Sequence, residues 1–291
     1  MQSGRMIDNA GSDGHIASRD GTRIGFRRFG RGPGVVLVQG AMATAVNFAN
    51  LAQALSPSFT VYAPDRRGRG MSPKPYDRRH DITRDVEDID ALLAETGASR
   101  VFGLSSGAMI TLEAARTLSR VTRASVYEPP FYPLGISRAG IEQLNAEIER
   151  DDLPAVLISA LRVSGTAPAP LRFLPQPIAR LLAKGVLRFD DRKHGAYVRL
   201  RDLLPGARYD FNVVGGMDGK METFRAIDKP MLLLSGTKSP AFLRQSIRKL
   251  NGILPQAEHI EFSGLGHSGS WNANRGGHPD TVAAALQEFF A

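Results

Sequence analysis

The stretch that decides the fold is Val101-Phe102-Gly103-Leu104-Ser105-Ser106-Gly107-Ala108-Met109-Ile110. An apolar run typical of a strand, residues 100–104, leads into Gly-x-Ser-x-Gly, and a helical pattern over residues 106–118 follows. This order predicts a nucleophile elbow with Ser105 at its apex. The two glycines of the motif leave room where a Cβ would clash with the packed strand and helix. The bare pattern also fits an ordinary Gly/Ser turn without chemistry, so the choice between the two depends on the rest of the sequence.

The composition is that of an ordinary globular protein. Of the 291 residues, 42% are hydrophobic and 23% are charged, which is enough to bury a large core. No apolar run reaches the roughly 18 residues needed to cross a bilayer, and the polar residues 1–19 lack the apolar segment of a signal peptide. We therefore expect a cytoplasmic protein with no membrane partner. The absence of cysteine excludes disulfides, thiolate metal sites and a cysteine nucleophile.

The formal net charge is +8, which raises the question of an anionic partner. The basic residues are mostly scattered arginines, and no Lys/Arg block alternates with aromatic residues as in a nucleic-acid module. We interpret the charge as a solubility feature, compatible with a preference for anionic substrates. We expect no nucleic-acid partner.

Strand and helix patterns alternate along both ends of the chain. Strands are expected at 23–29, 35–38, 59–63, 100–104, 123–127, 230–236 and 258–262, and the Asp20-Gly21 turn predicts one more strand before residue 18. Helices are expected at 46–55, at 84–95 between an N-cap at Thr83 and Gly97, at 106–118, at 240–250 and after Pro279. This alternation predicts an α/β fold with a mostly parallel central sheet flanked by helices.

The alternation stops in the middle of the chain, which divides it into segments. Residues 1–17 are expected to be disordered, and residues 18–130 form the first part of the α/β core. Residues 131–227 are predicted to form a helical cap, with helices at 137–150, 153–163, 178–189 and 196–203. Residues 228–291 complete the core.

Four residues fall at the carboxyl ends of predicted strands: Ala41, Asp65, Ser105 and Glu128. Right-handed crossovers place these ends at one edge of a parallel sheet, and ligands bind at that edge. A nucleophilic serine needs a base there, and His267 alone among the six histidines follows a late strand in a Gly-rich loop. The other five histidines have ordinary structural interpretations. His15 lies in the chain terminus, His80 and His194 are expected on the solvated surface, His259 on the surface of a strand, and His278 at the cap of the last helix.

These pieces resemble the α/β-hydrolase superfamily. The matching stretches are Val-Val-Leu-Val-Gln-Gly-Ala (35–41), Asp-Arg-Arg-Gly-Arg-Gly-Met-Ser (65–72), Gly-Leu-Ser-Ser-Gly (103–107), Leu-Leu-Leu-Ser-Gly (232–236) and Gly-Leu-Gly-His (264–267), in the family's order. The resemblance spans roughly residues 20 to 290. It implies a nucleophile Ser105, a base His267 and a cap inserted between the sixth and seventh strands.

The third member of the triad departs from the common pattern. The family usually carries an Asp shortly after the strand that here ends at Gly236, yet residues 231–257 contain no Asp or Glu. Glu128, just after the neighbouring strand, could reach the imidazole, an arrangement similar to that of zearalenone-type lactonases and some related esterases. We assign Glu128 as the orienting acid. The alternative is that Glu128 only caps the turn formed by the two prolines that follow it. Asp65 is the competitor, in a loop that the family uses structurally, paired with the nearby arginines.

The resemblance also implies the activity. Main-chain N–H groups of Ala41 and Ser106 would form the oxyanion hole for acyl transfer, although Gln39-Gly40 replaces the family's usual His-Gly. We expect a small hydrophobic ester or lactone as substrate, no metal or organic cofactor, and a monomer or homodimer. The residues expected to line the substrate site are Met42, Leu157, Leu161 and Phe173, with Leu174, Ile178 and Leu182 on the same cap helices. Carbon–carbon bond hydrolysis, a cofactor-free haloperoxidase-like reaction and a non-catalytic ligand-binding protein remain alternatives.

Overall fold

A central sheet of eight strands organises the protein. The computed structural model describes residues 11–168, 171, 174–193 and 197–291. The strand order is β1-β2-β4-β3-β5-β6-β7-β8. The first two strands are antiparallel to their neighbours and the others pair in parallel, as expected from the alternating pattern. The strands are β1 Ser12–Ala17, β2 Arg23–Phe29, β3 Gly34–Val38, β4 Thr60–Pro64, β5 Arg100–Leu104, β6 Arg123–Tyr127, β7 Met231–Gly236 and β8 Glu258–Phe262.

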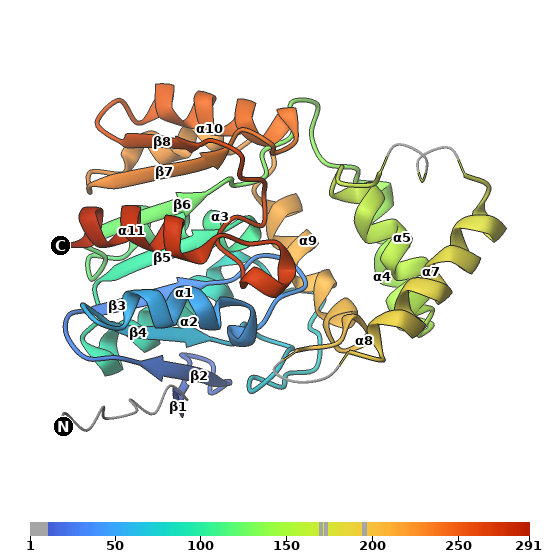
Figure 1. Cartoon of the computed structure of the whole chain (residues 1–291), viewed down its shortest axis with the longest axis horizontal. Helices are drawn as coiled ribbons and strands as arrows, with labels where there is room; N and C mark the ends of the chain where they lie inside the picture. Colours follow the sequence, from blue (N-terminus) through green and yellow to red (C-terminus); the bar gives the residue numbers. More distant parts are fainter. Residues whose placement is uncertain (1–10, 169–170, 172–173, 194–196) are drawn as a thin grey trace, which may run out of the picture.

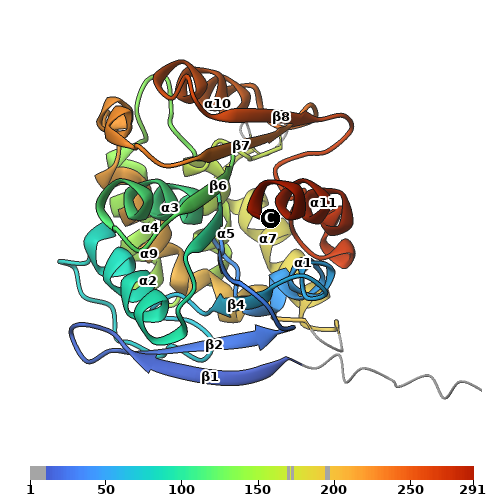
Figure 2. The ribbon, with the colours of Figure 1, turned by 90° about the vertical axis from the view of Figure 1, so that its left-hand side faces the viewer.

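Helices cover both faces of the sheet (Figures 1 and 2). One face carries α1 Ala49–Leu55 and α11 Pro279–Phe290, and the other carries α2 Ile82–Thr96, α3 Ser106–Thr117 and α10 Ala241–Ile253. The β-branched run of β3 is buried on both sides, because Val35 and Leu37 pack under the first layer and Val36 and Val38 under the second. Short 3-10 helices, η1 Ala45–Phe48, η2 Leu204–Gly206, η3 Met221–Ala226 and η4 Ala273–Arg275, connect these elements.

The segment between β6 and β7 is helical, as predicted. It contains α4 Arg138–Glu149, α5 Leu153–Val163, α7 Gln176–Asp190, α8 Leu200–Leu203 and α9 Ala207–Gly216. Figure 1 shows α4, α5 and α7 standing apart from the sheet, whereas α9 lies against the core. The helix expected at 196–203 is shorter than predicted where it is described, and residues 194–196 lie outside the described residues.

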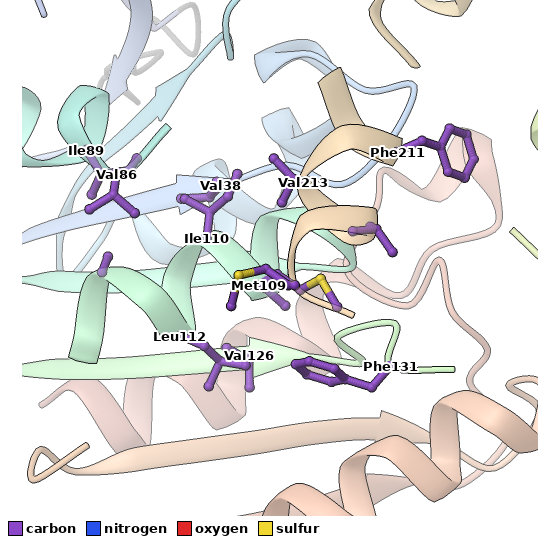
Figure 3. Packing of buried hydrophobic residues seen from close by; sticks show 14 of the residues in the cluster. Val38, Val86, Ile89, Met109, Ile110, Leu112, Val126, Phe131, Phe211 and Val213 are labelled. Atoms are coloured by element: carbon purple, nitrogen blue, oxygen red, sulfur yellow. The ribbon is translucent and has the colours of Figure 1, made fainter. Parts of the chain in front are cut away.

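The last helix of this segment, α9, was not predicted from the sequence. Its side chains join the cluster formed by α2 and α3, and Figure 3 shows Val213 beside Met109 and Ile110 of α3. The Phe211 ring in the same view points away from this layer. The expected cap, residues 131–227, therefore includes a helix that packs with the core.

The strand predicted before residue 18 is present, whereas the expected disorder of residues 1–17 is wrong for residues 12–17. They form β1, which pairs antiparallel with β2 from Ser12 opposite Arg28 to Ala17 opposite Arg23. Ile16 is buried, so the strand adds to the core, and Gly21 turns the hairpin with a φ of 77°. Residues 1–10 lie outside the described residues.

The start of α2 also differs from the prediction. The helix begins at Ile82, and the carboxylate of Asp81, not Thr83, caps it by accepting a hydrogen bond from the Thr83 N–H at 2.9 Å. An aspartate at the N-cap satisfies an N–H that the helix itself leaves without a partner. Gly97 ends the helix in the left-handed conformation, as expected. Over the described residues, no helix combines the length and apolarity needed to cross a bilayer.

Candidate active site

Ser105 lies at a strained turn between β5 and α3. Its backbone has a φ of 56° and a ψ of −122°, a region that residues with a side chain rarely adopt. The turn depends on close backbone contacts: a Cβ on Gly103 would lie 2.3 Å from the carbonyl oxygen of Gly107, and one on Gly107 would lie 2.3 Å from that of Val38. A Cβ on Gly40 would lie 2.9 Å from the Cβ of Ser105. The glycines therefore let β3, β5 and α3 meet tightly beneath the serine.

Glu128 follows β6 and is fully buried. Its Oε1 accepts a hydrogen bond from the backbone N–H of Gly236 at 2.8 Å, and its Oε2 lies 2.8 Å from Nδ1 of His267. The carboxylate thus occupies the space beside β7 and orients the imidazole. A hydrogen bond from Nδ1–H to a carboxylate leaves Nε2 as the ring nitrogen able to accept a proton.

The loop that carries His267 is held by a buried tyrosine. Burial raises the pKa of the Tyr127 hydroxyl, which keeps it protonated, and it donates to the carbonyl oxygen of Gly266 at 2.8 Å. A Cβ on Gly269 would lie 2.4 Å from the same hydroxyl, so the loop passes closely over the ring. Two consecutive residues therefore hold the imidazole in place: Tyr127, the last residue of β6, through the loop, and Glu128, which follows it, through Nδ1.

Ser105 and His267 line one pocket of about 40 Å³. Ala41, Ser105, Ser106 and His267 line it from the core, so residues separated by more than two hundred positions share one cavity. The remaining lining comes from the β6–β7 segment and α10: Pro130, Tyr132, Ser164, Thr166, Asp210, Phe211, Val214, Phe242 and Leu243. The first N–H groups of α3, including that of Ser106, have no acceptor within the helix and are available to a ligand.

The apolar lining of this pocket differs from the expected one. Leu157 is buried in the hydrophobic core, and Met42 and Leu161 pack against that core, but none of the three is among the described residues that line the pocket. Phe173 lies outside the described residues. Ile178 and Leu182 are exposed on α7. Helical spacing identified an apolar face on these helices, but it could not say which element that face would pack against.

Asp65 holds two loops together and does not contact His267 in the described structure. Its two carboxylate oxygens accept hydrogen bonds from the backbone N–H groups of Ala45 and Met71, at 2.6 and 2.8 Å, so it joins the loops after β3 and β4. Burial raises the pKa of this carboxyl. The expected pairing of its loop with the nearby arginines is wrong for Asp65 itself, because those arginines bind other carboxylates.

The alpha/beta hydrolase family profile matches residues 35–285, most of the chain. The chain belongs to the alpha/beta hydrolase family. The pimeloyl-[acyl-carrier protein] methyl ester esterase of Stenotrophomonas maltophilia is 30% identical over 276 residues, which cover 90% of this chain and 94% of that protein. The (R)-3-hydroxydecanoyl-ACP:CoA transacylase of Pseudomonas aeruginosa is 25% identical over 242 residues, 80% of this chain and 74% of that protein. An alpha/beta hydrolase structure from Sphaerobacter thermophilus has a TM-score of 0.77 and 30% identity, covering 96% of this chain and 100% of that one.

This α/β hydrolase contains a buried polar network beside the elbow that the sequence did not predict. Asp210 of α9 accepts hydrogen bonds from the Ser106 hydroxyl at 2.9 Å and from Arg69 at 3.1 Å, and it also pairs with Arg66. Arg66 in turn donates from Nε to Asp85 at 3.0 Å. A cap-segment carboxylate thus contacts the side chain of the residue after Ser105.

The network continues to a buried histidine. The Nε2 atom of His80 lies 2.8 Å from Asp85, and the His80 side chain is 3% exposed, so the expectation of a solvated surface histidine is wrong. Burial opposes the ionisation of Asp85, but Arg66 and His80 outweigh it and hold the pKa of that carboxyl below its usual value. One sequence signal was available: Asp85 and Asp88 lie beside Val86 and Ile89, on the inner side of an amphipathic helix. Acidic residues on the buried face of a helix need positively charged partners, because a buried charge without a partner is costly.

Proposed function

We propose that this α/β hydrolase is a serine hydrolase that cleaves a carboxylic ester or lactone of a small hydrophobic substrate through an acyl-enzyme. The supporting observation is the 2.8 Å contact between the buried carboxylate of Glu128 and Nδ1 of His267, which lines the same pocket as Ser105. Nucleophile, base and orienting acid are the three roles that acyl transfer needs.

In the proposed mechanism, the Ser105 hydroxyl oxygen attacks the carbonyl carbon while Nε2 of His267 accepts its proton. Glu128 stabilises the resulting imidazolium through Nδ1–H without taking the proton itself. The imidazolium then protonates the alkoxide as the carbon–oxygen bond breaks, which releases the alcohol and leaves the acyl group on Ser105. A water molecule, deprotonated by His267, attacks this ester, and the imidazolium returns the proton to the Ser105 oxygen as the acyl–oxygen bond breaks and the acid leaves.

The proposed oxyanion hole consists of the main-chain N–H groups of Ala41 and Ser106. Both residues line the pocket, and Ser106 opens α3, where the N-terminal end of the helix favours negative charge. Because the donors belong to the backbone, the replacement of the family's usual histidine by Gln39 does not remove an oxyanion donor. Its side chain instead donates to the carbonyl oxygen of Pro64.

The pocket lining and the relatives support the proposed substrate class. Tyr132, Phe211, Val214, Phe242 and Leu243 give the pocket an apolar wall that suits a hydrocarbon acyl or alcohol group. The Stenotrophomonas relative is named for a methyl ester, and a lactone presents the same carbonyl and leaving oxygen. We therefore propose ester or lactone bonds rather than amides as substrates.

The test is turnover of short p-nitrophenyl esters and of an aliphatic lactone, together with labelling by a fluorophosphonate. We expect the wild type to hydrolyse at least one of them and to be labelled, and Ser105→Ala to lose both. Ser119→Ala, at an exposed serine just after the carboxyl end of α3, is the matched control and should change neither. Absence of both labelling and turnover would identify a binding protein, and labelling without turnover would redirect the search to carbon–carbon bonds.

A further inference from the structure

The cap helix α7 exposes a row of large apolar side chains. Six large hydrophobic residues are exposed in the described part of the chain, and five of them lie on this one helix. They are Ile178 (49% exposed), Leu181 (70%), Leu182 (53%), Val186 (49%) and Phe189 (68%), at the three- and four-residue spacing that places them on one face. Exposed apolar side chains scattered singly are ordinary, but a continuous row indicates an interaction surface.

This row is not the face by which α7 joins the cap. Ala179, Ala183 and Leu187 are buried on another side of the helix, within the same cluster as the residues of α5. Figure 1 shows α7 at the edge of the molecule, with the sheet on the far side of the cap. The exposed row therefore remains after the helix has completed its packing within the chain.

A row of cations adjoins the apolar row. Arg180, Lys184 and Arg188 follow each other at four-residue spacing, and all three are exposed. Arg180 pairs with Asp152, whereas Lys184 and Arg188 form no ion pair with any residue in the described ranges. The single acidic residue of α7, Asp190, is buried and accepts hydrogen bonds from Tyr197 and the Leu200 N–H. Apart from Gln176 in its first turn, the long exposed side chains of this helix are thus apolar or positive, and none is acidic.

We propose that α7 docks on an anionic lipid surface, with its apolar row in the headgroup and acyl boundary. An apolar face bordered by Lys and Arg is the pattern of helices that lie in a membrane interface, where long basic side chains reach back to the phosphates. The net charge of +8 adds a long-range attraction to such a surface. This occupant differs from our expectation of no membrane partner, which considered membrane-spanning segments alone.

The cations argue against a second copy of the chain as the occupant. In a twofold contact each surface meets itself, so two antiparallel α7 helices would place the row of Arg180, Lys184 and Arg188 against its own copy. Facing rows of like charges repel each other. An anionic bilayer surface satisfies both rows, because its headgroups pair with the cations and its acyl boundary takes up the apolar side chains.

The test is sedimentation of the full chain with vesicles of phosphatidylcholine alone and of phosphatidylcholine with phosphatidylglycerol, at two salt concentrations. We expect binding to the anionic vesicles only, weaker at high salt. Leu181→Ser/Leu182→Ser and Lys184→Glu/Arg188→Glu should each reduce the binding at least about tenfold. Because these side chains are exposed, thermal unfolding should stay that of the wild type.

The matched control is Arg248→Glu/Lys249→Glu on α10, which reverses two exposed cations that form no ion pair with the described residues. It should leave vesicle binding within about twofold. An equal loss in this control would mean that net charge alone drives the binding and would overturn the proposal. So would a dimer that sediments without vesicles and dissociates in Leu181→Ser/Leu182→Ser. Because the measurement is binding, its result does not depend on the proposed catalysis, and Ser105→Ala should bind as the wild type does.

Discussion

At the scale of single residues, the carboxylate of Glu128 has two partners that call for different atoms. Its Oε1 accepts from the Gly236 N–H, and its Oε2 faces the imidazole nitrogen of His267. In Glu128→Gln the amide oxygen can keep the first contact, but the amide NH₂ then faces Nδ1. Such a group favours the tautomer with its proton on Nε2, which cannot accept the proton of Ser105.

We therefore expect Glu128→Gln to lower kcat on the order of 10³- to 10⁴-fold with little change in thermal stability. Steady-state kinetics and thermal unfolding of the same preparations measure this. Glu261→Gln, at an exposed position of β8, is the control and should keep wild-type kinetics. Full activity in Glu128→Gln would mean that another carboxylate orients the base.

The residues of this site differ in how far the sequence could reveal them. The positions of Ser105, Glu128 and His267 were predictable because each follows a strand, and parallel strands bring such positions to one edge. Asp210 lies 144 positions from Arg66, in a helix whose partner is set by tertiary packing. No local spacing connects the two, so the contact could not be predicted from one sequence.

At the scale of elements, the start of α2 offers a direct comparison between an expected and an observed cap. The sequence suggested Thr83, whereas the Asp81 carboxylate accepts from the Thr83 N–H. Both residues are good N-caps, so pattern alone did not decide between positions two residues apart. We expect Asp81→Ala to lower the free energy of unfolding by about 1 kcal/mol. Thr83→Ala should change it by less than about half that, and urea denaturation of both variants would show a reversed order if the expected cap were the true one.

The meeting of β3 with the elbow predicts a second effect at this scale. A methyl group on Gly40 would lie 2.9 Å from the Cβ of Ser105, so Gly40→Ala must displace the loop that carries Ala41. We expect kcat to fall about 10²- to 10³-fold, the effect of losing one oxyanion donor, with a stability cost of about 1–3 kcal/mol. Kinetics and urea denaturation measure the two effects.

The control for the added methyl group is Gly252→Ala on α10, where the new Cβ would meet nothing within 4 Å beyond its chain neighbours and the backbone of its own helix. It should leave kcat unchanged and raise stability by up to about 1 kcal/mol, because alanine favours a helix. Unchanged kcat in Gly40→Ala would show that the Ala41 loop does not contribute to the oxyanion hole.

At the scale of the whole molecule, the sequence predicted the layers but not the way the helical segment joins them. The buried β-branched run of β3 required helices on both faces, and the structure has them. The helices of the β6–β7 segment were visible by their spacing, yet spacing identifies an apolar face and not its partner. Consequently, the exposure of the α7 row and the packing of α9 on α3 both emerged only from the three-dimensional arrangement.

The junction between α9 and the core carries the last prediction. Asp210 binds Arg66 and Arg69 from the β4 loop and the hydroxyl of Ser106, and its side chain is 1% exposed. Asp210→Asn leaves buried cations with less compensation, which should destabilise the protein by about 3–5 kcal/mol. It also weakens the contact that holds Ser106, whose N–H we assign to the oxyanion hole. We therefore expect kcat to fall on the order of 10- to 100-fold, more than any rise in KM, at temperatures where the variant stays folded.

A second buried pair separates this catalytic effect from the loss of stability. Asp88 binds Arg67 through two hydrogen bonds of 2.6 Å, and its side chain is 8% exposed, but it does not contact Ser106. Asp88→Asn should therefore cost comparable stability in urea denaturation while leaving kcat within about twofold of the wild type. If the two variants lose kcat equally, the Asp210 carboxylate stabilises the fold without positioning Ser106. If only Asp210→Asn loses it, the cap segment contributes to the chemistry by fixing the residue beside the nucleophile.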